Sequence, residues 1–162
     1  MSVKHRRAKD LDSPATAGNA MLVQVQRSPE LVGVWGKQRG EWLGLFGTAA
    51  EGEGAFIEDP VGCPVHSGRE ARAKFFDTFI AANRITFVVR SELVCVASAS
   101  VWRDVELLVE FPSGGSALQP AHLHYQFDDS RTDGRKLPQL VSLQAFWSVD
   151  DQSPGWQLNI IC

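Results

Sequence analysis

The order of sequence patterns predicts an α+β fold in which helices pack on one face of a curved antiparallel sheet. Apolar segments with helical spacing dominate the first half of the 162-residue chain. From Arg84 onward the pattern changes to strands, separated by turn-rich linkers at residues 112–116 and 128–136. Helices followed by a continuous run of strands are typical of α+β domains, whose sheet buries one face against the helices.

The chain is expected to form one domain over residues 28–147, because a chain of this length usually builds a single core. Residues 1–27 are rich in Ala, Ser, Pro and Gly and carry a basic cluster near their start, which predicts a disordered tail. A basic arm for an acidic partner is the alternative interpretation of that cluster. Residues 148–162 are expected to form a C-terminal extension.

Charge and composition argue against several functional classes. The net charge of -3 and the pI near 5.8 give no electrostatic basis for nucleic-acid binding. No apolar run approaches the roughly 18 residues of a membrane span, and no signal peptide is recognised, so we expect a cytoplasmic protein with no membrane partner. Cys63, Cys95 and Cys162 are an odd number without close pairing, which predicts free thiols.

Three helices are predicted before the sheet. Ser28-Pro29-Glu30 has the residues of a helix start, and Leu31, Val34 and Trp35 follow at helical spacing. After a glycine-containing break, a short second helix is expected around residues 42–46. Ser67 and Glu70 have capping-box spacing for a third helix, which should end near Asn83.

Five strands are predicted after the third helix. They cover residues 85–90, 93–97, 101–111, 121–128 and 139–147, and the turns between them are short enough for an antiparallel meander.

The stretch from Phe56 to Gly62 contains the candidate catalytic carboxylate of the chain. An apolar pair precedes two adjacent carboxylates, Glu58 and Asp59, and then Pro60 and Gly62 end regular structure. Proline biases the preceding residue towards extended geometry, so Asp59 should lie where a short strand ends. Asp-Pro pairs also commonly form turns, and a turn residue is therefore the alternative to a catalytic carboxylate.

Arg103 occupies the apolar phase of the strand at residues 101–111, so its side chain is expected on the buried face. A buried guanidinium must be paired, because an uncompensated charge is costly. Two roles remain open: donation to an oxyanion in a pocket, or a structural salt bridge to an acid such as Asp59 or Glu58.

Several segments in the same order resemble one known group of proteins. They are Gly44-Leu45-Phe46, "EDPVG" from Glu58, "SGREARAKFFDTF" from Ser67 and "VSLQAFW" ending at Trp147. Over residues 28–147 the chain resembles the ketosteroid isomerase and SnoaL-like polyketide cyclase group of the nuclear-transport-factor-like superfamily. The resemblance implies a cone-shaped barrel with a strongly curved sheet around a deep apolar pocket, no cofactor, and a homodimer through the outer sheet face.

The resemblance also implies that Asp59 is a general base that moves a proton between carbons next to a ketone. Ketosteroid isomerase places a tyrosine and a protonated aspartic acid at the oxyanion. Here the early helix has Glu30 or Trp35 in the tyrosine's neighbourhood. At the acid's position, alternation favours Leu123, whereas counting from Pro120 gives His122.

The candidate site follows from these interpretations. The candidate catalytic residues are Asp59, Arg103 and His122, and the expected pocket lining is Trp35, Phe56, Phe79, Leu123, Tyr125 and Trp147. His122 and His124 share a strand face, but without a nearby third ligand we expect no metal site. The leading hypothesis is an isomerase or cyclase for an apolar ketone or polycyclic substrate. Its alternative is a ligand-binding or dimerisation module without catalysis.

Overall fold

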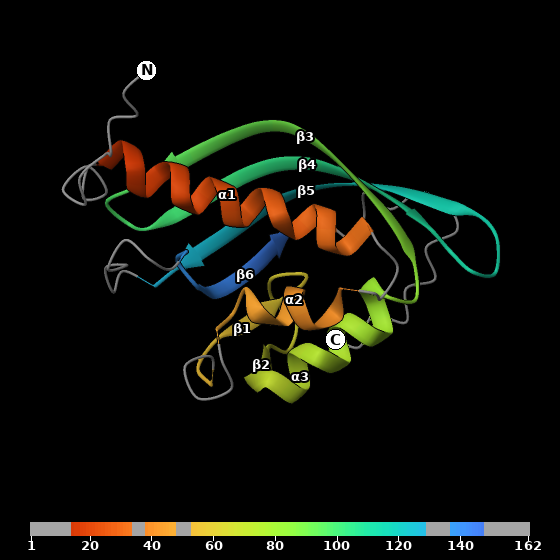
Figure 1. Ribbon diagram of the computed structural model, residues 1–162. Coiled ribbons are helices and arrows are strands. Elements are labelled where there is room, and N and C mark those ends of the chain that lie inside the picture. Colours follow the sequence, from red (N-terminus) through yellow and green to blue (C-terminus); the bar gives the residue numbers. More distant parts are fainter. Residues whose placement is uncertain (1–13, 34–37, 48–52, 129–136, 148–162) are drawn as a thin grey trace, which may run out of the picture.

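The structure of the chain is a computed structural model that describes residues 14–33, 38–47, 53–128 and 137–147. The predicted α+β class is confirmed: one mixed sheet of six strands curves over the helices, and it stays open instead of closing into a barrel (Figure 1). Within the described residues, no helix is long and apolar enough to cross a membrane.

The four late strands form the predicted antiparallel meander, and two short early strands extend it. The spatial order is β2-β1-β6-β5-β4-β3, and all neighbours are antiparallel except β1 and β6, which run parallel. The strand bounds are β1 Phe56–Glu58, β2 His66–Ser67, β3 Arg84–Cys95, β4 Ser100–Glu110, β5 Ser116–Phe127 and β6 Leu140–Phe146. Gly114 and Gly115 both have positive φ, near 88° and 89°, in the β4–β5 turn, a conformation that glycine adopts without strain.

The first helix begins much earlier than predicted. Helix α1 spans Pro14–Gly33, so the predicted tail is wrong for residues 14–27, and the helix start predicted at Ser28 is wrong as well. The physical reason is that Met21 and Val25, one helical turn apart, are buried in the core, where α1 packs against β3 and β4. Residues 1–13 and 148–162 lie outside the described residues.

The second and third helices match the prediction more closely. Helix α2 spans Arg39–Gly44, and helix α3 spans Gly68–Phe75 and continues as a π-helical turn, η2, over Phe76–Ile80. Ser67 does occupy the cap position of α3, but its side chain makes no capping hydrogen bond.

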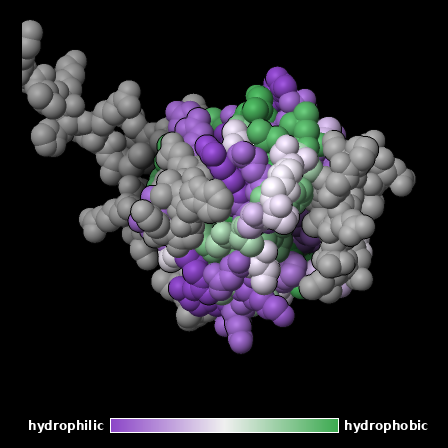
Figure 2. All heavy atoms as spheres, turned by 90° about the vertical axis from the view of Figure 1, so that its right-hand side faces the viewer, coloured by the Kyte–Doolittle hydropathy of each residue, from purple (hydrophilic) through white to green (hydrophobic). Residues whose placement is uncertain are grey.

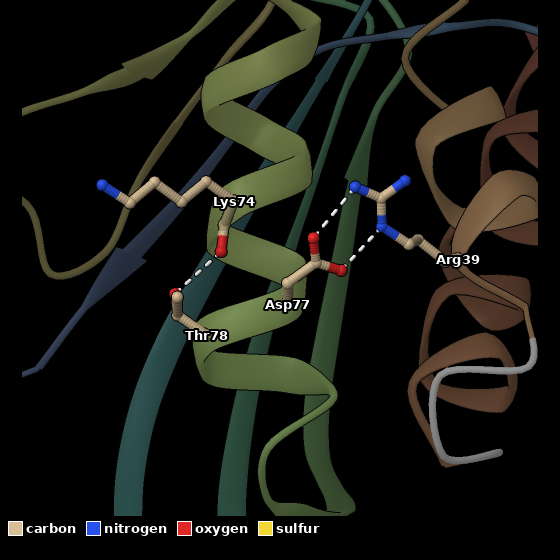
Figure 3. A network of polar contacts seen from close by, with 4 residues as sticks. All are labelled: Arg39, Lys74, Asp77 and Thr78. Atoms are coloured by element: carbon tan, nitrogen blue, oxygen red, sulfur yellow. Dashed lines mark hydrogen bonds and ion pairs between the residues drawn. The ribbon is translucent and has the colours of Figure 1, made fainter.

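An ion pair joins α2 to η2. The Arg39 guanidinium donates to both carboxylate oxygens of Asp77, at 2.6 and 2.9 Å, and Thr78 donates its hydroxyl hydrogen to the Lys74 carbonyl one turn earlier (Figure 3). The pair is exposed to solvent, so it contributes little to the stability of the fold.

The two strands predicted at residues 85–90 and 93–97 are one strand, β3. A bulge between Val89 and Ser91 shifts its pairing with β4 by one residue. An inserted residue reverses which face each later side chain occupies, and this is why the alternation in the sequence breaks there.

Strand β3 is also an edge of the sheet. Its Val88 and Val89 are exposed, and hydrophobic residues gather towards the top of the view in Figure 2, the side on which β3 lies in Figure 1. Bulges and charged side chains such as Arg84 and Arg90 are common means of preventing edge strands from pairing with other chains.

Arg103 lies on the buried face of β4, as its phase predicted, with 4% of its surface exposed. Its Nε donates to Glu92 Oε2 at 2.5 Å, and the two residues are direct cross-strand partners in β3 and β4. The structural salt bridge is therefore the role observed, but its acid is Glu92. Neither Asp59 nor Glu58 takes part in this ion pair.

Arg103→Met should destabilise the fold by roughly 1–3 kcal/mol, because it leaves the Glu92 carboxylate without its partner in a partly buried position. Urea unfolding beside the wild type measures this loss. Arg90→Met is the matched control, since its ion pair with Glu106 is exposed and should be worth under about 1 kcal/mol. Equal losses in the two variants would contradict a structural role for the buried pair.

Candidate functional site

A pocket lies between the helices and the inner face of the sheet. Aromatic side chains form much of its wall: Trp42 comes from α2, Phe75 and Phe79 from α3 and η2, and Phe87 from β3. Aliphatic side chains from β3, β4, β5 and β6 complete it, and they are Ile85, Leu107, Leu123, Leu143 and Ala145, with Ile80 from η2. An apolar pocket with few polar groups is typical of sites for small organic ligands.

Asp59 is the charged residue among those that line this pocket. It follows β1 directly and precedes Pro60, to which it is joined by a cis peptide bond. The sequence prediction that Asp59 lies at a strand end is correct to within one residue.

The other carboxylate of the pair holds the loop in place. Glu58 Oε1 accepts the Gly62 N–H at 2.9 Å, and Glu58 Oε2 accepts the side-chain amide of Gln144 in β6 at 2.8 Å. The hydrogen bond from Gly62, followed by that from Gln144, lowers the pKa of Glu58, which stays ionised. The Val61 N–H donates to the Ala145 carbonyl at 2.8 Å, so the loop is tied to β6 at two points.

One side chain from beyond β6 orients the Asp59 carboxylate. Trp147 Nε1 donates to Asp59 Oδ1 at 2.7 Å. Among the described residues, no arginine, lysine or histidine forms an ion pair with Asp59.

The environment changes the acidity of Asp59. Burial in the apolar pocket raises its pKa to about 6, and the hydrogen bond from Trp147 opposes that rise. Asp59 keeps a partly accessible surface while it lines the pocket, so a ligand can reach it. A carboxylate with this pKa is largely ionised at neutral pH and is a stronger base than an ordinary aspartate.

The predicted pocket residues divide into four groups. Phe79, Leu123 and Tyr125 line the pocket with Asp59. Trp147 contacts the site through its bond to Asp59. Phe56 lies in β1 but is not among the lining residues, because the buried position of that strand is Ile57. Trp35 lies outside the described residues.

Of the two neighbouring residues considered in β5, Leu123 is the one that faces the pocket, as the alternation predicted. Leu123 is buried and lines the pocket, whereas His122 points to the outer sheet face, where its Nδ1 contacts Asp104 Oδ1 at 2.5 Å. The assignment of His122 as a catalytic residue is therefore wrong. Arg103 and Leu123 are paired across β4 and β5, but Arg103 is not among the lining residues.

The sequence analysis did not identify Phe75 in the third helix, Phe87 in β3 or Leu107 in β4 as pocket-lining residues. The signal was present for Leu107, which shares the phase of Arg103, and for Phe75, which shares a helix face with Phe79. The signal was also present for Phe87, which precedes the bulge and shares its phase in β3 with Ile85.

Two further predictions concern cysteines and metals. Cys63, four residues after Asp59, is disulfide-bonded, so the prediction of free thiols is wrong there, while Cys95 is a free, exposed thiol. Spacing did not reveal this bond because widely separated cysteines can meet only through the tertiary fold. In the part of the chain that the structure describes, no three His, Cys, Asp or Glu side chains form a metal-binding group.

No protein-family model matches this sequence, and no curated protein matches it by sequence. Solved structures do match by shape. RV0760c from Mycobacterium tuberculosis, in complex with estradiol-17beta-hemisuccinate, has a TM-score of 0.67 and 25% identity over 83% of this chain and 98% of its own. The delta 5-3-ketosteroid isomerase from Mycobacterium sp. has a TM-score of 0.67 and 23% identity, over 83% of this chain and 97% of its own.

A putative polyketide cyclase from Xanthomonas campestris is more distant in sequence. It has a TM-score of 0.62 and 12% identity, over 83% of this chain and 94% of its own. These similarities extend over nearly the full length of each neighbour. The chain therefore has the fold of the ketosteroid isomerase and SnoaL-like polyketide cyclase group of the nuclear-transport-factor-like superfamily.

Proposed function

We propose that the chain is a cofactor-independent isomerase or cyclase that moves a proton on carbon next to the carbonyl of an apolar ketone or polycyclic substrate. The observation that carries this proposal is a lone carboxylate, Asp59, whose apolar pocket raises its pKa to about 6. Such a group accepts a proton at neutral pH and returns it readily, as a general base must.

The proposed reaction is a proton transfer through one carboxylate. Asp59 removes the proton from the carbon beside the carbonyl, and the electron pair of the C–H bond moves into the carbonyl to form an enolate. In an isomerase, Asp59 then returns the proton to another carbon of the enolate. In a cyclase, the enolate carbon forms a bond to the carbon of a second carbonyl, whose π electrons move onto its oxygen, and that oxygen takes up the proton that Asp59 removed. Trp147 keeps the carboxylate aimed at the substrate throughout.

Charge that develops on the substrate oxygen needs a hydrogen-bond donor. Arg103 is occupied by Glu92, and Leu123 has no donor to offer. Tyr125 is the phenol that lines the same pocket, and we assign it this role. Two structural neighbours support an apolar ligand of the steroid class. RV0760c is in complex with estradiol-17beta-hemisuccinate. A computationally designed 17-OHP binder has 22% identity and a TM-score of 0.67, over 83% of this chain and 97% of its own.

The second candidate is a ligand-binding module without catalysis. Leu123 favours it, because this lining residue is aliphatic at the position where the resemblance implies the second acid. Replacement of Asp59 should lower the turnover of an isomerase or cyclase, whereas a binding module does not depend on Asp59 for turnover.

Asp59→Asn should lower turnover of a ketosteroid substrate by about 10²–10⁴-fold, with ligand affinity nearly unchanged, because the amide keeps the shape and loses the proton affinity. In the wild type, kcat/KM should rise with pH up to about 6 and then level off as Asp59 ionises. Asp77→Asn, in the exposed pair with Arg39, is the control and should behave as wild type. Equal turnover by wild type and Asp59→Asn would favour the binding module.

Asp59→Asn should also stabilise the fold above pH 6. Below about pH 4 the carboxyl is neutral in both the folded and unfolded states. As pH rises, the unfolded state loses this proton first, so the folded state is disfavoured by up to about 3 kcal/mol above its own pKa of about 6. Urea unfolding at pH 8 should show that gain, and at pH 4 the two proteins should match. A less stable variant at pH 8 would contradict a desolvated carboxylate.

The outer sheet face is the proposed homodimer surface. Trp102 stacks on His124 at 4.1 Å between ring centroids, Phe146 lies 5.6 Å from Trp102, and exposed Leu93 and Leu118 lie on neighbouring strands. Exposed apolar patches of this kind mark interfaces.

Sedimentation at micromolar concentration should therefore show a dimer for the wild type and a monomer for Trp102→Glu, because the charge would be buried at the interface. Val65→Glu, at an exposed position outside the sheet face, is the control and should stay dimeric. A monomeric wild type would contradict the proposed homodimer and would leave the proposed reaction unaffected.

A further inference from the structure

The carboxylate that precedes Asp59 belongs to a row of side chains that crosses the outer face of the sheet. Glu58 in β1 is the register partner of Gln144 in β6, and Gln144 is in turn the partner of His124 in β5. His124 is the partner of Trp102 in β4. Register partners in adjacent strands lie side by side on one face, so these four residues form one outer row. The pocket-lining residues of β5 and β6 alternate with them and lie on the opposite face.

Each neighbouring pair in the outer row is in contact. Gln144 Nε2 donates to Glu58 Oε2 at 2.8 Å, and His124 Nδ1 lies 3.3 Å from Gln144 Oε1. The His124 ring stacks on Trp102 with 4.1 Å between the ring centroids. A continuous series of contacts therefore runs from β4 to Glu58, which begins the Asp59 loop, residues 58–62.

The charge of Glu58 fixes the direction of both hydrogen bonds. Its bonds to Gly62 and Gln144 lower its pKa, so the ionised carboxylate only accepts hydrogens. The Gln144 atom that faces it is therefore the amide nitrogen, because a flipped amide would place two oxygens against each other. Gln144 Oε1 then accepts from His124, whose Nδ1 must carry a hydrogen. Rotation of the Gln144 amide would break both bonds at once.

The carboxylate that receives the Gln144 hydrogen bond also closes the Asp59 loop. Glu58 Oε1 accepts the Gly62 N–H at 2.9 Å, so Asp59 lies between the two residues that this bond joins. Movement of the Glu58 side chain would release Gly62 and with it the segment that carries Asp59. The outer row thus holds, from the far side of the sheet, the loop whose carboxylate lines the pocket.

We propose that Gln144 and His124 are positioning residues that hold the Asp59 loop through Glu58 and keep the Asp59 carboxylate directed into the pocket. Neither residue touches the substrate. Their effect on turnover rests on the proposed function, whereas their effect on the loop does not. A misplacement of a reacting group by about 1 Å lowers a rate by up to roughly 10²-fold, so a loop that loses its support should turn over substrate more slowly.

Gln144→Met removes both hydrogen bonds at similar size. For the β,γ-unsaturated isomer of androstenedione, kcat should fall about tenfold while KM stays within about twofold of the wild type, because the pocket wall is unchanged. Amide hydrogen exchange, measured by NMR without substrate, should be about tenfold faster at Gly62, whose partner Glu58 is no longer held. The amide of Leu123, within the sheet, should exchange as in the wild type and shows that the effect is local.

Two substitutions of His124 separate hydrogen bonding from packing. His124→Phe keeps the ring on Trp102 and loses the donor, so kcat should fall about fivefold and Gly62 should exchange faster. His124→Asn loses the ring but keeps a nitrogen donor close to the position of Nδ1, so it should stay within about twofold of the wild type in both measurements. A role in packing alone predicts the reverse order. His122→Phe, the same change on the same sheet face, is the control and should match the wild type.

The outcomes separate this inference from the proposed reaction. Wild-type kcat and Gly62 exchange in Gln144→Met would overturn the positioning role and leave the chemistry at Asp59 untouched. Impairment of His124→Asn with wild-type behaviour of His124→Phe would overturn it as well, and so would equal impairment of His122→Phe. Faster Gly62 exchange in Gln144→Met and His124→Phe, without turnover by the wild type, would support the outer row as the holder of the loop and contradict the proposed isomerase.

Discussion

The parallel pairing of β1 with β6 is the constraint on which the site depends. Three residues of β1 pair with three of β6, and the loop that follows is bonded to β6 again through Val61 and Glu58. These contacts bring the end of a short early strand, residue 58, beside the end of the last described strand, residue 146. Asp59 and Trp147, 88 positions apart, consequently meet at 2.7 Å.

The two adjacent acids show how neighbouring residues of one type acquire opposite roles. Glu58 faces hydrogen-bond donors from Gly62 and Gln144, which stabilise its charged form and lower its pKa. Asp59 faces the apolar pocket, where burial raises its pKa to about 6. One residue of displacement along an extended chain reverses the direction of a side chain. Glu58 therefore holds the loop in place, whereas burial destabilises the charged form of Asp59.

Three polar side chains lie next to apolar residues on the inner side of the sheet, and each has a different hydrogen-bonding environment. Arg103 is paired with Glu92 across two strands. Asp59 is held by Trp147 while it faces the pocket. Gln119 alone among these three has a buried atom without a partner. Gln119 pairs across the strands with Leu107, which lines the pocket, but Gln119 itself is not among the lining residues.

The sequence by itself determined the fold class, the order of the late strands, the strand-end position of Asp59, the burial of Arg103 and the choice of Leu123 over His122. All of these follow from local rules, because alternation fixes the face of a residue and proline limits the residue before it. Only the tertiary structure decided where α1 begins, that β3 continues through a bulge, that Glu92 is the partner of Arg103 and that Cys63 is disulfide-bonded. Each of these depends on contacts between segments distant in sequence or on an inserted residue that changes the phase, and neither is encoded in a local pattern.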